Sequence, residues 1–181
     1  DGKTDLAVGA RGYSTDTGRA YLFYNDGSIP TTAATADVII TGETTNNYFG
    51  IALSSGDWNA DGKADLAVGA YGYSASTGRV YLFYNDGSIP MTAASADVII
   101  TGGVSSFFGV HITSGDFDAD GKIDLAAGSY GSGVYIFYND GSYPTGAASA
   151  DVIITGEEAY CGWYAMTSGD FDADGTTDLA V

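Results

Sequence analysis

The sequence predicts an all-β protein built from repeated antiparallel sheets of four short strands. The first observation is internal repetition: DLAVGA begins at Asp5 and Asp65 and recurs as DLAAGS at Asp124 and DLAV at Asp178. These copies start 60, 59 and 54 residues apart. The second is composition, since 27 glycines in 181 residues disfavour helices. The third is that the apolar segments are short and end at Gly, Asn, Asp or Pro, as strands between tight turns do.

Each repeat is expected to contain four strands. In the second repeat these span residues 49–56, 65–70, 79–84 and 97–101, and the third repeat matches the first of them at 108–115. Alternate side chains of a strand point to opposite faces of its sheet. In segment 79–84 both alternating sets are apolar or aromatic. Both faces of the sheet must therefore be covered.

Four-stranded sheets stacked face to face on copies of themselves meet this requirement, which is the arrangement of blades in a β-propeller. A two-sheet sandwich is the alternative. A sandwich would leave one face of each sheet in water, so polar and apolar residues would alternate along its strands. The sequence lacks this alternation. We predict one partial β-propeller of four-stranded antiparallel blades over residues 1–181. Residues 1–47 form a blade that lacks its inner strand, and residues 48–106 and 107–160 form two complete blades. Residues 161–181 form the first two strands of a further blade.

The two ends of the chain repeat one another. Residues 1–8 read DGKTDLAV and residues 174–181 read DGTTDLAV. The expected strands number thirteen, one more than three sets of four, and three blades are fewer than the 4–8 of a propeller. We therefore expect about three blades of a larger ring, completed by further blades from the same or another chain. A strand-swapped oligomer is the alternative.

An acidic loop separates the first and second strands of each repeat. It reads DWNADGKAD from Asp57, DFDADGKID from Asp116 and DFDADGTTD from Asp170. Oxygen-bearing side chains recur at positions one, three, five and nine. The glycine at position six allows the backbone to reverse, so that the carbonyl at position seven can face the same point. These carbonyls belong to Lys63, Lys122 and Thr176.

A hairpin-capping turn would explain one such loop, but three loops with one spacing indicate a metal site. Carboxylates crowded together repel each other unless a cation neutralises them. Calcium fits better than magnesium, which prefers a smaller octahedral shell that retains water. Three calcium sites are expected. A partial loop (Asp1, Lys3 and Asp5) would supply a fourth if completed.

The net charge restricts the kinds of partner that the chain can bind. The chain has a formal charge of −17, which excludes nucleic-acid binding through a basic patch and disfavours anionic membranes. No apolar stretch approaches the ~20 residues of a membrane-spanning helix, so membrane insertion is not expected. Calcium sites of extracellular modules have Kd values on the order of 10⁻⁴–10⁻³ M and fill outside cells. The sequence therefore predicts a secreted, extracellular or cell-surface protein stabilised by metal, with one cysteine, Cys161.

The order Phe-Gly, acidic loop, then apolar strand ending in Gly-Ala resembles the FG-GAP repeat, which builds the seven-bladed propeller of integrin α chains and many bacterial surface proteins. The matching pairs are Phe49-Gly50, Phe108-Gly109, Gly9-Ala10 and Gly69-Ala70. The last repeat departs from the pattern with Cys161-Gly162, and the third with Gly128-Ser129. The resemblance implies a total of six to eight blades, seven by analogy.

By this resemblance, the side-chain ligands of the three metal sites are Asp57, Asn59, Asp61 and Asp65; Asp116, Asp118, Asp120 and Asp124; and Asp170, Asp172, Asp174 and Asp178.

The loops expected on the opposite face vary between repeats, as binding loops on a constant scaffold do. Their aromatic side chains are candidates for stacking on a sugar or a protein partner, and an arginine for pairing with an anion. These candidates are Arg11, Tyr13, Tyr48, Tyr71, Tyr73, Phe107, Tyr130 and Tyr160. Packing of the tyrosines between blades is the alternative.

The sequence does not favour an enzyme. His111, the single histidine, lies on an expected inner strand, and Cys161 has no evident partner for a catalytic dyad. We therefore predict a non-catalytic propeller that mediates adhesion or protein–protein interaction, with a protein or glycan of a cell surface or matrix as its partner. A carbohydrate-binding propeller and an accessory domain of a larger secreted enzyme are the alternatives.

Overall fold

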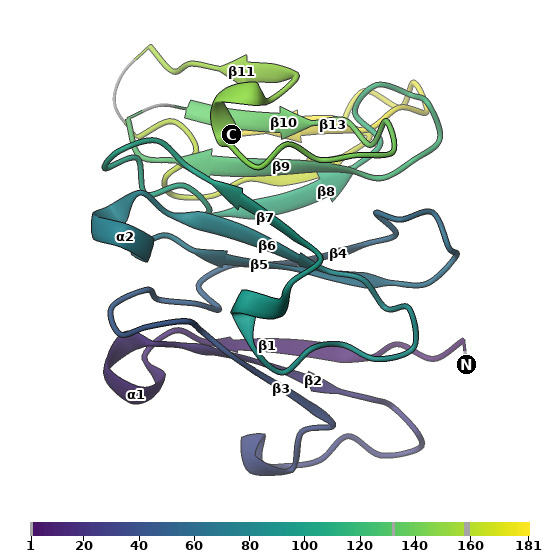
Figure 1. Ribbon diagram of the computed structural model, residues 1–181. Coiled ribbons are helices and arrows are strands. Elements are labelled where there is room, and N and C mark those ends of the chain that lie inside the picture. Colours follow the sequence, from purple (N-terminus) through teal and green to yellow (C-terminus); the bar gives the residue numbers. More distant parts are fainter. Residues whose placement is uncertain (1, 132, 158–159) are drawn as a thin grey trace.

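The computed structural model describes residues 2–131, 133–157 and 160–181 of the chain. Over these ranges the chain forms thirteen β-strands in four antiparallel sheets, and the all-β prediction is confirmed. The sheets follow one another in chain order, from the purple N-terminal sheet to the yellow-green C-terminal one (Figure 1). None of the described helices is long and apolar enough to cross a membrane.

The first sheet has three strands in the order β1-β2-β3, with bounds Leu6–Ala10, Arg19–Phe23 and Val38–Thr41. The second has the order β4-β5-β6-β7, with bounds Leu53–Gly56, Asp65–Ala70, Arg79–Phe83 and Val98–Thr101. The third has the order β8-β9-β10-β11, with bounds Ile112–Gly115, Asp124–Ser129, Gly133–Phe137 and Val152–Ile154. The last pairs β12 with β13, with bounds Thr167–Gly169 and Asp178–Ala180.

Short helical turns occupy two kinds of connection. One kind is α1 (Tyr13–Asp16), between β1 and β2, and its counterpart α2 (Tyr73–Ser76), between β5 and β6. In α1 the φ angles of Ser14 and Thr15 are +48° and +54°, in the left-handed region. A 3₁₀ turn precedes the last strand of each of the first three sheets, at η1 (Ala33–Thr35), η2 (Ala93–Ser95) and η3 (Ala147–Ser149).

The core lies between the sheets, and β6 shows why. Val80 and Leu82 of this strand join a buried cluster with Phe137 of the third sheet. Tyr81 and Phe83 point the other way, into a cluster shared with the first sheet. The alternation along the strand therefore buries both faces of the second sheet, as the sequence predicts.

The Phe-Gly and Gly-Ala pairs meet where neighbouring sheets touch. A side chain at Gly69 of β5 would collide with the backbone carbonyl of Gly109, which precedes β8. Gly109 itself has φ +83°, a conformation that favours glycine. Phe108 beside it is fully buried, with its ring 5.6 Å from that of Tyr135 and 6.2 Å from that of Phe137. The repeated dipeptides thus allow close sheet-to-sheet contact.

The inner strands are shorter than the sequence predicts. The expected segments 49–56 and 108–115 form strands only from Leu53 and Ile112 onward. The left-handed glycine of each Phe-Gly pair turns the chain, so the phenylalanine leaves the sheet and packs between sheets.

Candidate metal centre

The three acidic loops connect β4 to β5, β8 to β9 and β12 to β13. In the second loop, carboxylate oxygens of Asp116, Asp118 and Asp120 lie within 4.8 Å of one another. The same holds in the third loop for the side chains at positions one, three and five, Asp170, Asp172 and Asp174. The first loop carries an amide at position three, Asn59. Its hydrogen bonds follow the same pattern.

Backbone N–H groups bring these oxygens together. The N–H of Asp61 donates to the carboxylate of Asp57 at 3.0 Å and to the amide oxygen of Asn59 at 3.1 Å. The N–H of Gly62 donates to the second oxygen of Asp57 at 2.8 Å. Gly62 has φ +85°, so the reversal that directs its N–H inward uses the left-handed region that favours glycine.

The ninth residue of each loop is an anchor. Asp65 is 2% exposed, and its carboxylate accepts hydrogen bonds from the N–H groups of Trp58 at 2.9 Å and Asn85 at 2.8 Å. Asp124 does the same with Phe117 at 2.7 Å and Asn139 at 2.8 Å. Each carboxylate ties its loop to the turn that follows the third strand.

Burial raises the pKa of Asp65 and of Asp124, and the backbone donors only partly oppose this effect. A buried carboxylate that is charged at neutral pH benefits from a nearby cation.

Position seven differs between the loops. Lys122 places its ammonium 2.7 Å from a carboxylate oxygen of Asp120 and 2.9 Å from the carbonyl oxygen of Asn139. Lys63 makes the equivalent contacts with Asp61 and Asn85, both at 3.0 Å. Hydrogen bonds from these lysines hold the pKa values of Asp61 and Asp120 below the usual range. The first two loops therefore carry an internal positive charge.

The third loop has an uncharged residue at position seven. The hydroxyl of Thr176 donates to Asp174 at 2.6 Å, and this bond lowers the pKa of Asp174. The clustered side chains Asp170, Asp172 and Asp174 are exposed, and the loop contains no lysine.

The partial N-terminal loop keeps only the anchor in the described residues. Asp5 accepts a hydrogen bond from the N–H of Asn25 at 2.8 Å, as Asp65 does from Asn85. Lys3 is exposed, and Asp1 lies outside the described residues.

The donor chemistry suits a hard divalent cation. Calcium takes six to eight oxygen ligands at flexible geometry, and carboxylates at positions one, three and five supply several from one short loop. The sequence indicated the spacing of these oxygens. The lysines at position seven of two loops are visible in the sequence, but their contacts with the loop carboxylates could not be predicted from it.

The candidate binding residues of the opposite face fall into two groups. Five of them join an aromatic ladder, which we define as seven rings contributed by successive loops: Tyr48, Tyr71, Phe107, Tyr130, Tyr160, Trp163 and Tyr164. The rings of Tyr48 and Tyr71 stack with centroids 4.7 Å apart, and Arg11 lies over Tyr48 at 5.7 Å. Trp163, which the sequence reasoning missed, contacts both Phe107 and Tyr130.

The other two aromatic candidates, Tyr13 and Tyr73, are covered by arginines. The guanidinium of Arg19 lies 3.7 Å from the ring centre of Tyr13, and that of Arg79 lies 3.5 Å from the ring centre of Tyr73. The repeated sequence GYSxxTGR, with Tyr and Arg six residues apart, was the signal that could have paired them.

Comparison with known proteins relates the chain to several larger ones. A model of the FG-GAP-like repeat matches residues 57–127 and 116–181. The chain is 36% identical over 153 residues to phosphatidylinositol-glycan-specific phospholipase D of Rattus norvegicus, over 73% of this chain and 18% of that protein. It is 33% identical over 168 residues to integrin alpha-PS2 of Drosophila melanogaster, over 83% of this chain and 12% of that protein.

Integrin alpha-IIb of Mus musculus is 33% identical over 151 residues, which cover 76% of this chain and 14% of that protein. The chain thus spans less than a fifth of the length of these relatives. Because the repeat model matches more than half of the residues, the chain belongs to the FG-GAP-like repeat family.

Proposed function

We propose that this chain is a calcium-binding segment of an extracellular β-propeller that mediates adhesion or protein–protein contact without catalysis. The observation that supports this most is the convergence of carboxylates at positions one, three and five of the acidic loops, with an anchor carboxylate at position nine. Such oxygen sets match calcium, and loops of this kind fill at the millimolar calcium found outside cells.

The stacking of the sheets supports the propeller. Clusters of buried side chains join the first sheet to the second, the second to the third and the third to the last. The inner strands also contact one another through hydroxyls, since Ser54 and Ser114 lie 3.0 Å apart and Thr113 and Ser168 lie 2.9 Å apart. These contacts fit blades arranged around a common axis, in a ring of seven by analogy with the family.

Calcium in this proposal holds the acidic face together. The first two loops are tied to the neighbouring turns through their anchor aspartates, so a bound cation would stiffen both loop and turn there. At ten times the Kd, one site adds about 1.4 kcal/mol to the free energy of unfolding, and three sites add roughly 4 kcal/mol. For a chain of this length that corresponds to roughly 10 °C in melting temperature.

The test combines metal analysis with melting curves. Protein stripped with EGTA and dialysed against about 1 mM calcium should bind the ion and melt roughly 10 °C higher than in EGTA, with a smaller gain in magnesium. The double variant Asp118→Ala, Asp172→Ala should lose most of this gain. Asp86→Ala, an exposed aspartate outside the loops, serves as the control. An unchanged melting temperature together with absence of bound calcium would refute the proposal.

A second candidate function is carbohydrate binding, which the aromatic ladder favours. Tyr160 and Tyr164 are 47% and 73% exposed, and their rings lie 5.9 Å apart. Exposed rings with hydroxyls offer both stacking surface and hydrogen bonds to a sugar. Glycan-array binding that Tyr164→Ala abolishes would support this candidate. Capture of one defined surface protein, with no signal on the array, would favour the protein-contact proposal.

The similarity to a phospholipase D supports a further setting, an accessory domain of a larger secreted enzyme. In that case this chain would bring the enzyme to its substrate or stabilise the enzyme's catalytic domain. The chain alone would then show no hydrolysis of a phosphatidylinositol-glycan, and the full-length protein would.

A further inference from the structure

A turn with the sequence Asn-Asp-Gly-Ser follows each of the strands β2, β6 and β10. After β6 it contains the pair Asp86-Gly87, and both of these residues are exposed. Gly87 has φ +125°, and a Cβ placed on it would meet no atom within 4 Å. Exposed turn tips with small and polar residues are among the least restrained parts of a folded chain.

An Asp-Gly pair can rearrange without an enzyme or a co-reactant. The backbone nitrogen of the glycine attacks Cγ of the aspartic acid side chain, and the new C–N bond closes a five-membered succinimide. One water leaves, made of the acid hydroxyl and the amide proton. Water then adds to the main-chain carbonyl of the ring and breaks its bond to the nitrogen, which gives an isoaspartate of unchanged mass. The backbone now runs through Cβ and Cγ and is one carbon longer.

The reaction needs a glycine nitrogen and a carboxyl group that can approach each other. Among residues 2–131, 133–157 and 160–181, neither the N–H of Gly87 nor the carboxylate of Asp86 takes part in a hydrogen bond or an ion pair. Glycine also lacks a side chain that would hinder the approach. The counterpart Asp140 is more restrained, because its carboxylate accepts the N–H of Ser142 at 3.3 Å.

The acidic loops contain the same dipeptide, but there both reacting groups are held. The N–H of Gly62 donates to the carboxylate of Asp57 at 2.8 Å. The carboxylate of Asp61 accepts the N–H of Lys63 at 2.9 Å. The other two loops hold their pairs in the same way, Asp120-Gly121 and Asp174-Gly175. Attack in these loops would first require the loss of a hydrogen bond, which costs free energy.

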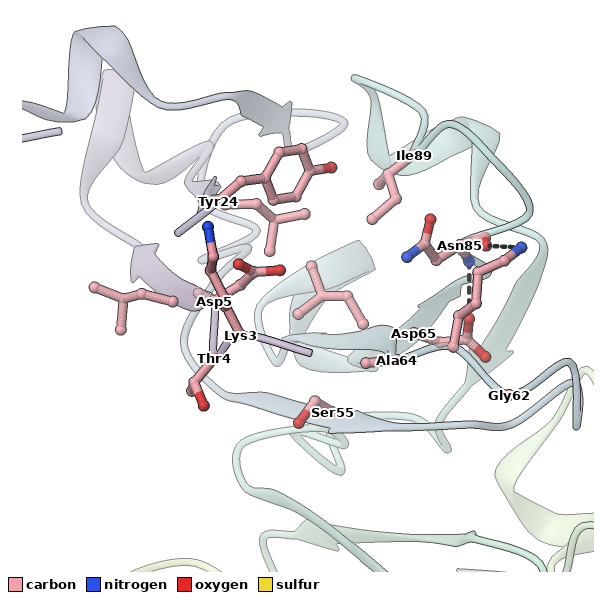
Figure 2. A pocket seen from close by; sticks show the side chains of 15 residues that line it. Lys3, Thr4, Asp5, Tyr24, Ser55, Gly62, Ala64, Asp65, Asn85 and Ile89 are labelled. Carbon is pink, nitrogen blue, oxygen red and sulfur yellow. Dashed lines mark hydrogen bonds between the residues drawn. The ribbon is translucent and has the colours of Figure 1, made fainter. Parts of the chain in front are cut away.

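We propose that Asp86 rearranges to isoaspartate in the folded protein, and that this change releases the first acidic loop from its neighbouring turn. Asn85, directly before Asp86, donates its N–H to the anchor Asp65 at 2.8 Å. Its carbonyl accepts the ammonium group of Lys63 at 3.0 Å. Figure 2 shows Asn85 beside Asp65, with the hydrogen bonds between turn and loop dashed.

One additional backbone carbon after Asn85 changes the path of this turn. Asn85 then moves away from the carboxylate of Asp65, which is 2% exposed and loses a donor. Removing a partner from a buried carboxylate is costly, so the loop is destabilised. The proposal concerns an acidic loop of the proposed function, but it needs no bound calcium.

The test is to age the folded chain in EGTA at physiological temperature and to map isoaspartate after digestion. Mass spectrometry with electron-transfer fragmentation separates isoaspartate from aspartate. Isoaspartate should accumulate at Asp86 roughly tenfold faster, or more, than at Asp61, Asp120 or Asp174. In guanidinium chloride the four sites should react at similar rates, because the unfolded chain holds none of them. Equal rates in the folded protein, or no isoaspartate at Asp86, would overturn the proposal.

Two variants check the cause of the difference. Asp86→Glu keeps the charge but would need a six-membered ring, so it should show no rearrangement at this site. Asp57→Ala removes the acceptor of the Gly62 N–H and should raise isoaspartate at Asp61 by roughly threefold or more, in protein that a melting curve shows to be folded. An unchanged level at Asp61 would contradict the protection of the loops by hydrogen bonding.

Release of the loop is measured separately, by melting curves of fresh and aged protein in EGTA. The aged parent should melt about 2–4 °C lower than the fresh parent, whereas aged Asp86→Glu should keep its melting temperature. Equal losses in the two proteins would overturn the release of the loop. Since calcium is absent throughout, this outcome is distinct from a failure of the proposed calcium binding.

Discussion

The hydroxyl of Tyr81 donates a 2.7 Å hydrogen bond to the carboxylate of Glu43, which joins the second sheet to the loop that follows the first. Arg79 reaches the same oxygen at 2.7 Å, so one carboxylate serves two partners. Burial, with Glu43 beside it, raises the pKa of Tyr81, and the hydroxyl stays protonated as a donor. A connection between sheets thus depends on three side chains.

Replacing Glu43 should weaken the fold. Tyr81 is fully buried, and Glu43→Ala would remove the acceptor of its hydroxyl and of Nη1 of Arg79, whose Nε still donates to Thr101. We expect a loss of about 1–3 kcal/mol in the free energy of unfolding, measured by chemical denaturation. Glu157→Ala removes the same charge from an exposed position and should change little. A double-mutant cycle with Tyr81→Phe should show coupling, and additive effects would contradict this account.

Exchanging the residues at position seven should redistribute calcium affinity. The ammonium of Lys122 touches Asp120 and repels a cation bound nearby. Two unit charges about 4 Å apart in water interact by about 1 kcal/mol. Lys122→Thr should therefore tighten the second site by about threefold to tenfold, and Thr176→Lys should weaken the third by a similar factor. Calorimetric titration measures both, and equal affinities in the two variants and the parent would contradict the prediction.

Trp58 should contribute more to stability than any exposed apolar residue. Its side chain is buried between the second and third sheets. Trp58→Ala should cost about 3–5 kcal/mol, because it removes apolar contacts and leaves a cavity. Val104→Ala, at a 93% exposed position, should cost close to nothing. Matching denaturation midpoints for the two variants would show that the packing is not as described.

His111 should make stability depend on pH. Partial burial lowers its pKa below the usual value near 6.5, so the unfolded chain takes up a proton more readily than the folded one. The stabilising contribution is complete above about pH 6.5 and declines as the pH falls through the folded-state pKa. With calcium held in excess, the unfolding free energy of the parent should fall more steeply between pH 7.5 and 5.5 than that of His111→Gln. Parallel profiles would disprove the assignment.

Local sequence was enough to predict the repeats, the strand type and the FG-GAP pattern. Segment 65–70 became β5 with the predicted bounds, because its apolar run ends at turn residues on both sides. The inner strands were predicted too long. The left-handed turn at Gly109 accompanies its close contact with Gly69 of the neighbouring sheet, which the local sequence does not reveal. The left-handed run at Ser14 and Thr15 carries no glycine that would have signalled it.

The metal loops were visible in the sequence, because their ligands are spaced within nine residues and their geometry is local. Whether those ligands bind calcium remains a prediction that the tests above address. The other contacts join residues far apart in the chain. Only the stacking of sheets brings Glu43 to Tyr81 and Trp163 to Phe107. Local spacing sets which side chains share a loop or a face, whereas contacts between sheets depend on how whole sheets pack, which no short stretch of sequence encodes.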